Sequence, residues 1–170
     1  LLPSLMVSIA IGLRPLIWDA TALAQENKTD SSLRTKTRAN RWIDRVVNGE
    51  RISYLLGNVF IDRDSLTAAC DTAHYYRDRE VYEFIGNVVL TQNNGVLTCR
   101  HGFHYRTTGE SDFFGDVRLT ESDVIGTGRK GQSRDFGRFF HLIEDALLVT
   151  PDYTVRADTI SQDRQNNTGE

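Results

Sequence analysis

The sequence predicts an all-β protein, elongated and built from stacked antiparallel rungs. Three observations predict this fold class: a short motif recurs at a constant spacing, apolar residues alternate with others around it, and turn residues separate the alternating stretches. The motif Leu56-Gly57-Asn58-Val59 returns at Gly86 and Gly115, and a fourth copy has Glu144 in place of the glycine. The copies are evenly spaced with a period of about 29 residues, and a fixed period in this range is typical of repeat architectures.

Residues 1–24 predict a secretory signal peptide whose start is missing. The stretch Leu1–Leu13 is almost wholly apolar, and Ala22-Leu23-Ala24 has the small-residue pattern of a cleavage site. A membrane anchor is the alternative, but the apolar run is shorter than the ~20 residues of a span, and Arg14 and Pro15 interrupt it. We therefore expect export and cleavage.

Residues 25–38 are polar and lack periodicity, which predicts a linker. The repeat domain is expected to cover residues 39–170, because Ala39–Gly57 overlays Ala68–Gly86 without a gap. The pattern is still running at Glu170, so we expect the domain to continue beyond that residue.

In each copy of the motif, a large apolar residue stands two positions before the glycine, and apolar residues stand two and four positions after it. Alternate residues share one face of a strand, so these side chains stack into one apolar seam across the rungs. The predicted seam consists of Leu55, Val59, Ile61, Phe84, Val88, Leu90, Phe113, Val117, Leu119, Leu142 and Leu148. Leu56 and Ile85 are also apolar but have the opposite parity, and a bulge or bend at the glycine would resolve this conflict.

The second strand of each unit is expected to place one set of side chains on a single face: Ala68, Cys70, Thr72, His74 and Tyr76, with Leu97, Cys99, His101, Phe103 and Tyr105 as their equivalents. If each repeat makes two rungs, Cys70 and Cys99 are about 9.5 Å apart. A disulfide requires Cα atoms within ~7 Å. We favour this arrangement, with two reduced, core-facing cysteines, although one rung per repeat would leave a disulfide open.

The composition indicates a folded domain without an electrostatic footprint for nucleic acid. Hydrophobic residues make up 39% of the chain and charged residues 25%, the net charge is −3, and the basic residues are scattered. The stretch 126–131 is glycine-rich and basic, but it lacks the spacing and the following helix of a phosphate-binding loop. We expect it to depart from the regular wall of strands.

Neither catalysis nor a bound metal or cofactor is expected. Cys99 and His101 share a face of the predicted strand while His104 points the other way, which favours wall side chains over a zinc site. The acidic residues do not form the isolated pair that glycoside cleavage needs. Instead, charged residues recur at or near one repeat position, as on a solvated face: Asp71, Arg100, Lys130 and Asp158.

The repeated strand Ile85-Gly86-Asn87-Val88, followed by a turn and a strand of small residues ending in tyrosine, resembles the OstA-like family of lipopolysaccharide-transport proteins. This family includes the periplasmic bridge protein LptA and the N-terminal domain of the translocon LptD. The stretch Cys70–Tyr76 is similar to the form of OstA-like proteins of Bacteroidetes. The resemblance covers residues 40–170. It implies a taco-like β-jellyroll, an apolar groove for the acyl chains of lipid A, and stacking with other jellyroll proteins through strand edges.

The resemblance thus implies a periplasmic, non-enzymatic module that binds and transports lipopolysaccharide, with outer-membrane association left open. Arg129 or Lys130 near the lipid A phosphates is a hypothesis from charge alone. One alternative is a structural β-repeat module that self-associates through its open strand edges. Another is a carbohydrate-active β-helix enzyme that uses Asp71.

Overall fold

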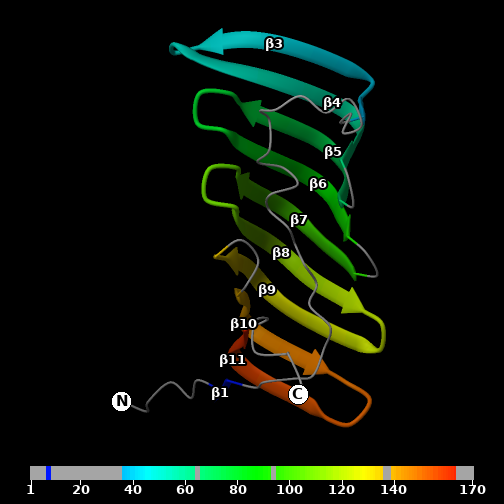
Figure 1. Ribbon diagram of the computed structural model, residues 1–170. Helices are drawn as coiled ribbons and strands as arrows, with labels where there is room; N and C mark the ends of the chain where they lie inside the picture. The colour runs from blue at the N-terminus through cyan, green and yellow to red at the C-terminus, as the bar shows by residue number, and fades with distance from the viewer. Residues whose placement is uncertain (1–6, 9–35, 64–65, 93–94, 136–138, 164–170) are drawn as a thin grey trace.

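The structure, a computed structural model, describes residues 7–8, 36–63, 66–92, 95–135 and 139–163. These residues form one sheet, which confirms the predicted all-β class (Figure 1). Most of the predicted signal peptide and linker lies outside them. The strands are β1 (Val7–Ser8), β2 (Lys36–Arg38), β3 (Arg41–Val47), β4 (Glu50–Arg63), β5 (Leu66–Tyr76), β6 (Val81–Gln92), β7 (Gly95–Tyr105), β8 (Glu110–Glu121), β9 (Val124–Arg134), β10 (Phe139–Val149) and β11 (Thr154–Asp163). Across the described residues, no helix has the length and hydropathy to cross a membrane.

From β4 to β11 each strand pairs antiparallel with the next, so the strands stack in sequence order like rungs (Figure 1). At one end of the stack, β2 and β3 both pair with β4 and together form an interrupted edge strand. Three residues of the predicted linker, Lys36–Arg38, therefore belong to the sheet. At the other end, β1 pairs in parallel with β11 at Ile160 and Ser161.

The turn between β3 and β4 is tighter than the equivalent turn one repeat later. Val81 pairs with Tyr76, but Ile52, which stands one repeat before Val81, pairs with Arg45. The turn at Asn48-Gly49 is therefore two residues shorter than the turn at 77–80. The ungapped overlay of the first unit on the second is accordingly wrong before Glu50.

The long strands bend at the repeated motif. The pairing of β4 with β5 shifts register between Leu56 and Val59, and the later copies shift likewise, which confirms the predicted bulge. Gly86 has a φ of 75° and Asn87 a φ of 47°, a left-handed conformation that glycine adopts freely and asparagine tolerates. A Cβ atom at Gly86 would also collide with the carboxylate of Asp71.

The bulges also shift the alternation of side chains along the partner strands. The buried apolar residues form one cluster on a single face of the sheet, which we call the inner face. Cys70 and Cys99 lie on it as predicted, but the next inward residue follows after three positions, at Ala73 and Gly102, because the bulge adds a residue to the register. The expectation that the residues two, four and six positions after each cysteine share its face is therefore wrong: Thr72, His74, Tyr76, His101, Phe103 and Tyr105 face outward.

Candidate functional site

The bulges divide the inner face into two walls. The first wall ends at the turns 77–80 and 106–109, and the second wall ends at turns such as 122–123. On the first wall, strand pairing lines up one residue from each strand into a row that runs along the stack. From β3 to β11, this row contains Trp42, Leu55, Ala73, Phe84, Gly102, Phe113, Gly131, Leu142 and Ile160. Every member is apolar or glycine.

The second wall is apolar in the same way. Next to the bulges, the cross-strand pairs are Val59–Cys70, Val88–Cys99, Val117–Gly128 and Ala146–Ala157. Nearer its turns, a further row contains Thr37, Ile61, Ala68, Leu90, Leu97, Leu119, Gly126, Leu148 and Val155. Together with the first row, these positions give the inner face three apolar rows, whose members are apolar or glycine except for Thr37 at the β2 end.

The structure places all eleven predicted seam residues in this one buried cluster, with exposed fractions from 1% for Val88 to 9% for Leu148. Phe140 and Ile160 belong to the same cluster but were missed. They stand where earlier repeats have Ser111 and Gly131, so the repeat pattern gave no signal for them.

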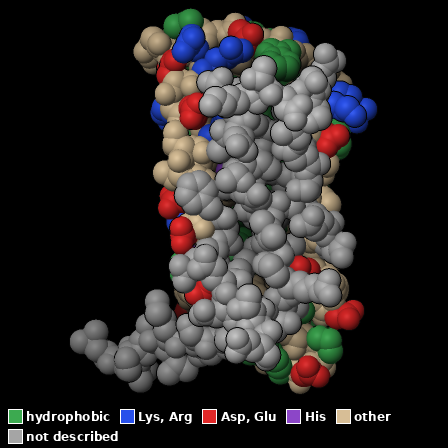
Figure 2. Space-filling model, viewed as in Figure 1, with side chains coloured by type: hydrophobic (Ala, Val, Ile, Leu, Met, Phe, Trp, Pro, Cys, Tyr) green, Lys and Arg blue, Asp and Glu red, His purple; other side chains and the backbone are tan. Residues whose placement is uncertain are grey.

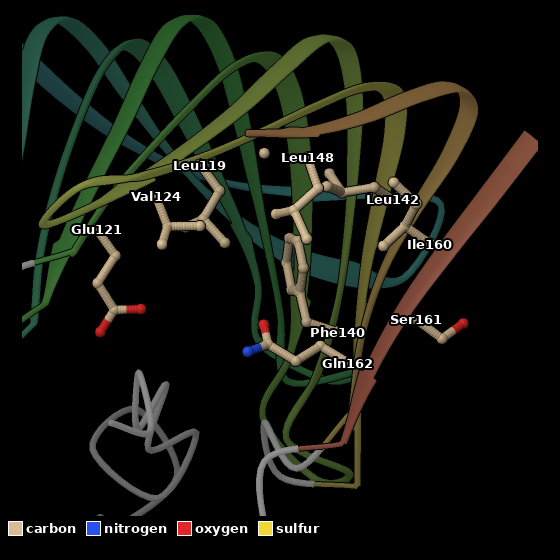
Figure 3. A pocket seen from close by; sticks show the side chains of 10 residues that line it. Leu119, Glu121, Val124, Phe140, Leu142, Leu148, Ile160, Ser161 and Gln162 are labelled. Atoms are coloured by element: carbon tan, nitrogen blue, oxygen red, sulfur yellow. The ribbon is translucent and has the colours of Figure 1, made fainter. Parts of the chain in front are cut away.

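A small apolar cavity of about 30 Å³ lies on the inner face near β11. Figure 3 shows Leu142, Leu148 and Ile160 turned toward one another beneath the arching strands, with Phe140 beside them. Glu121 lies at the far side of this cavity, beyond Leu119. The apolar surface thus continues to this end of the stack.

The glycine-rich stretch 126–131 was expected to depart from the wall of strands. This expectation is wrong, because the stretch forms a regular part of β9. Its glycines make room for large neighbours instead. A Cβ atom at Gly126 would lie 2.7 Å from Cδ1 of Leu142, and one at Gly131 would lie 3.0 Å from Cγ1 of Val117. The glycines therefore compensate the volume of the side chains packed over them.

One row of the inner face is different, and we call it the polar row. It runs beside the apolar row of the first wall, one step nearer the turns 77–80 and 106–109. From β3 to β11, it contains Asp44, Ser53, Tyr75, Tyr82, His104, Ser111, Ser133, Phe140 and Gln162. Among the described residues, the buried polar side chains are Ser53, His104, Arg106, Ser111 and Ser133, so four of the five belong to this row.

His104 is the most enclosed ionisable member of the polar row, with 5% of the residue exposed. Its Nδ1 lies 2.9 Å from Oγ of Ser111, while its Nε2 is buried and has no hydrogen-bond partner in the part of the chain that the structure describes. Burial, and then the nearby charge of Arg106, lower the pKa of His104 to about 4. The imidazole is therefore neutral at pH 7.

Both cysteines are free and buried, which confirms the predicted reduced, core-facing pair. Burial raises the pKa of Cys70 to about 11 and that of Cys99 to about 12. Each thiol lies within hydrogen-bond distance of a backbone oxygen of its own strand, 3.2 Å from Thr72 and 3.4 Å from His101. The thiols thus stay protonated and behave as small apolar side chains.

Two of the histidines considered with the cysteines, His74 and His101, lie on the outer face, whereas His104 lies on the inner face with Cys99. The predicted arrangement, with His101 on the face of Cys99 and His104 opposite, is therefore reversed, because the bulge shifts the alternation between Cys99 and Gly102. On the outer face, Tyr76 donates a hydrogen bond of 2.6 Å to Glu83, and His74 and His101 contact the same carboxylate at 3.1 and 2.9 Å. Burial opposes the ionisation of Glu83, but these three contacts outweigh it and lower its pKa. The sheet itself separates this cluster from Cys99, so the two do not form a joint site.

The edge strand β3 exposes apolar side chains: Trp42 is 54% exposed, Val46 68% and Val47 40%. Figure 2 shows hydrophobic side chains among basic ones at this end of the molecule. Within the described chain, β3 pairs with β4 alone. A strand edge of this kind is a template for pairing with another chain.

Comparison with known proteins gives the same architecture. Residues 50–168 match the family model described as the LptA/LptD N-terminal domain of LPS transport proteins. No curated protein matches the sequence. A crystal structure that is similar is that of LptH, the LptA-homologous periplasmic component of the lipopolysaccharide transport device of Pseudomonas aeruginosa. The two chains share 12% identity with a TM-score of 0.57, over 69% of this chain and 87% of LptH.

Proposed function

Because this chain belongs to the LptA/LptD N-terminal domain family of LPS transport proteins, we propose that it binds lipopolysaccharide on its inner face and passes it along the stack. The observation that carries this proposal is the continuity of the three apolar rows from one end of the stack to the other. The acyl chains of lipid A lie on these rows, and each buried methylene contributes ~0.8 kcal/mol. Since the apolar row of the first wall contains only apolar residues or glycine at every rung, an acyl chain can slide along it without breaking a specific polar contact.

We place this activity in the periplasm, as for LptH, with residues 1–24 as the exported chain's signal peptide. Its partners are other jellyroll proteins of the transport bridge, joined through the edge at β3 and through the edge of β11, which β1 occupies until residues 1–24 are cleaved. Support for the β3 edge comes from Trp42 and Val46, because exposed apolar side chains on an edge strand are unfavourable in water. Val46→Lys should therefore weaken this association, whereas Arg100→Lys, remote from both edges, should not.

The test of lipid binding is photo-crosslinking in cells with a probe in place of Phe113. Its control is built into the chain: Phe114 is the next residue and faces outward, whereas Phe113 is 2% exposed on the inner face. We expect a crosslink to lipopolysaccharide at position 113 and none at 114. A second inner probe at Phe140, beside the cavity, covers the case in which the probe at 113 prevents folding.

If neither inner position crosslinks in folded protein, the inner face is a closed core, and the chain is a structural β-repeat module that self-associates through its edges. Crosslinks of equal strength at positions 113 and 114 would also contradict the proposal, because they would show contact without a preferred face.

A further inference from the structure

The three apolar rows do not explain why the first wall also carries the polar row. A buried hydroxyl, imidazole or guanidinium loses its water and needs a partner, so a row of such groups in an apolar interior is costly. The members of the polar row come from successive strands and fall in one line, so chance does not explain why polar side chains gather there. On the second wall, the described row from Ile61 to Leu148 is apolar or glycine throughout.

Two arginines at the turn end of the first wall reach back onto the polar row. Arg77 donates a hydrogen bond of 3.0 Å from Nε to Oγ of Ser53. Arg106, its equivalent one repeat later, donates one of 2.7 Å from Nη1 to the hydroxyl of Tyr75. Arg106 is only 6% exposed, whereas the side chain of Arg77 is 42% exposed and also pairs with Asp44 at 3.1 Å. Two guanidinium groups are thus held against the same line of hydroxyls.

The polar row also contains a group whose hydrogen bonding is incomplete. His104 Nε2 is buried on the inner face and has no hydrogen-bond partner among the described residues. Such an atom is rare in a folded interior, and a polar ligand on the inner face would supply what it lacks.

The other two basic residues considered as phosphate ligands, Arg129 and Lys130, do not lie on the inner face. Arg129 pairs with Asp145 and Lys130 with Glu144, at the bulge and on the outer face of the sheet. The hypothesis that they meet lipid phosphates finds no support in this placement. On the inner face, the second wall has the carboxylate of Glu121 beyond its apolar row (Figure 3). The carboxylate of the polar row, Asp44, is paired with Arg77.

We propose that Arg77, Arg106 and the polar row bind the anionic, hydroxyl-bearing headgroup of the lipid whose acyl chains lie on the apolar rows. This inference rests on the proposed function and adds an orientation to it. Guanidinium groups suit phosphate because their N–H donors form paired, charge-assisted hydrogen bonds with its oxygens. Serine, tyrosine and histidine suit sugar hydroxyls. The headgroup then leaves the inner face beside the turns 77–80 and 106–109, and the acyl chains point toward Leu90, Leu97 and Leu119 on the second wall.

The test compares two lipids that differ only in their phosphate groups: lipid A with its phosphates, and the same lipid A after enzymatic dephosphorylation. Binding of each to the full chain is measured by displacement of a fluorescent lipid. The variants are Arg106→Gln and Arg77→Gln, and the control is Arg100→Gln, an arginine that is exposed and paired with Asp116 away from the inner face. We expect each of the two variants to weaken binding of phosphorylated lipid A at least tenfold and to leave the dephosphorylated lipid within twofold. The control should change neither.

Arg106 is buried and its substitution can unfold the chain, so Arg77→Gln, at a half-exposed side chain, decides the result if Arg106→Gln does not fold. Equal weakening of both lipids would overturn the inference, because the arginines would then act through the fold. Unchanged binding of both lipids by the variants would also overturn it, while leaving the proposed lipid transport intact. If the wild-type chain binds neither lipid, the proposed function fails together with the inference.

Discussion

Arg129 forms an ion pair with Asp145, with 2.7 Å between Nη2 and Oδ2, at the fourth bulge of the sheet. Arg100 and Asp116 make the same pair at the third bulge, one repeat earlier along the chain. Arg129 is thus the structural equivalent of Arg100, and Lys130 stands one residue from that position, within the predicted recurrence of charges at or near one repeat position. The side chains of both pairs are more than 70% exposed, so each pair contributes at most ~1 kcal/mol to stability. The same ion pair at the third and fourth bulges shows that the bulge occupies an equivalent position in these two repeats.

The bulge conformation predicts that Gly86→Ala is strongly destabilising. The left-handed φ of 75° costs an L-residue ~1–2 kcal/mol, and the added Cβ atom would also meet Asp71. Gly49→Ala is the matched control, because Gly49 has a φ of 84° but nothing within 4 Å of an added Cβ atom. Urea unfolding should show a larger loss for Gly86→Ala than for Gly49→Ala. Equal losses would mean that the contact with Asp71 relaxes without cost.

The fourth bulge carries Glu144 at a φ of 63° in place of glycine, which is strained for a residue with a side chain. Glu144→Gly and Glu144→Ala both remove the ion pair with Lys130, and they differ only in the Cβ atom. We expect the glycine variant to be more stable than the alanine variant by ~1 kcal/mol in the free energy of unfolding. An alanine variant of equal or greater stability would show that this bulge relaxes its backbone when the side chain is shortened.

The burial of His104 predicts acid sensitivity. Its pKa is about 4 in the fold and 6.5 for a free imidazole, so the unfolded chain takes up the proton first as the pH falls. The contribution of neutral His104 to stability is therefore complete above pH 6.5 and is lost between pH 6.5 and 4, about 3 kcal/mol in all. His104→Gln should flatten the free energy of unfolding across this range. If the free energy of unfolding of His104→Gln changes with pH as steeply as that of the wild type, other groups cause the acid sensitivity.

The two cysteines predict slow alkylation by a maleimide at pH 7. Their raised pKa values of about 11 and 12 lower the reactive thiolate fraction about 100-fold or more below that of a thiol at 9.0, and burial slows the reaction further. The control is Val46→Cys in a chain with Cys70 and Cys99 changed to serine, since Val46 is 68% exposed. Labelling of Cys70 or Cys99 as fast as this control would show that the inner face opens to water.

The apolar seam was predictable because a stack of identical rungs needs the same kind of side chain at the same place in each rung. Leu55, Phe84, Phe113 and Leu142 therefore repeat visibly in the sequence. The bend was predictable as well, because Leu56 and Ile85 are apolar at the wrong parity for an unbroken strand. Both predictions use only the order of side chains along one strand of the repeat, and this order can be read from the sequence.

What depends on pairing between strands was not predictable. The bulge lies in β6, but it changes which side chains of β5 and β7 face inward, and nothing in those two segments marks the shift. The alternation of Cys99, His101 and Phe103 looks unbroken in the sequence. The polar row was missed for the same reason, because Ser53, Tyr75 and His104 become neighbours in a row only when the register of every pair is known.

The recurrence of the bulges also restricts how the molecule can change in length. Tyr76 pairs with Val81 and Tyr105 with Glu110 in equivalent hairpins, one repeat apart. Deleting or duplicating one whole repeat between such points joins equivalent positions and changes the stack by two strands, ~9.5 Å. An insertion of one residue within a strand would turn every following side chain to the opposite face. Duplication and recombination can thus lengthen the stack in fixed increments, while the four bulges hold its cross-section constant.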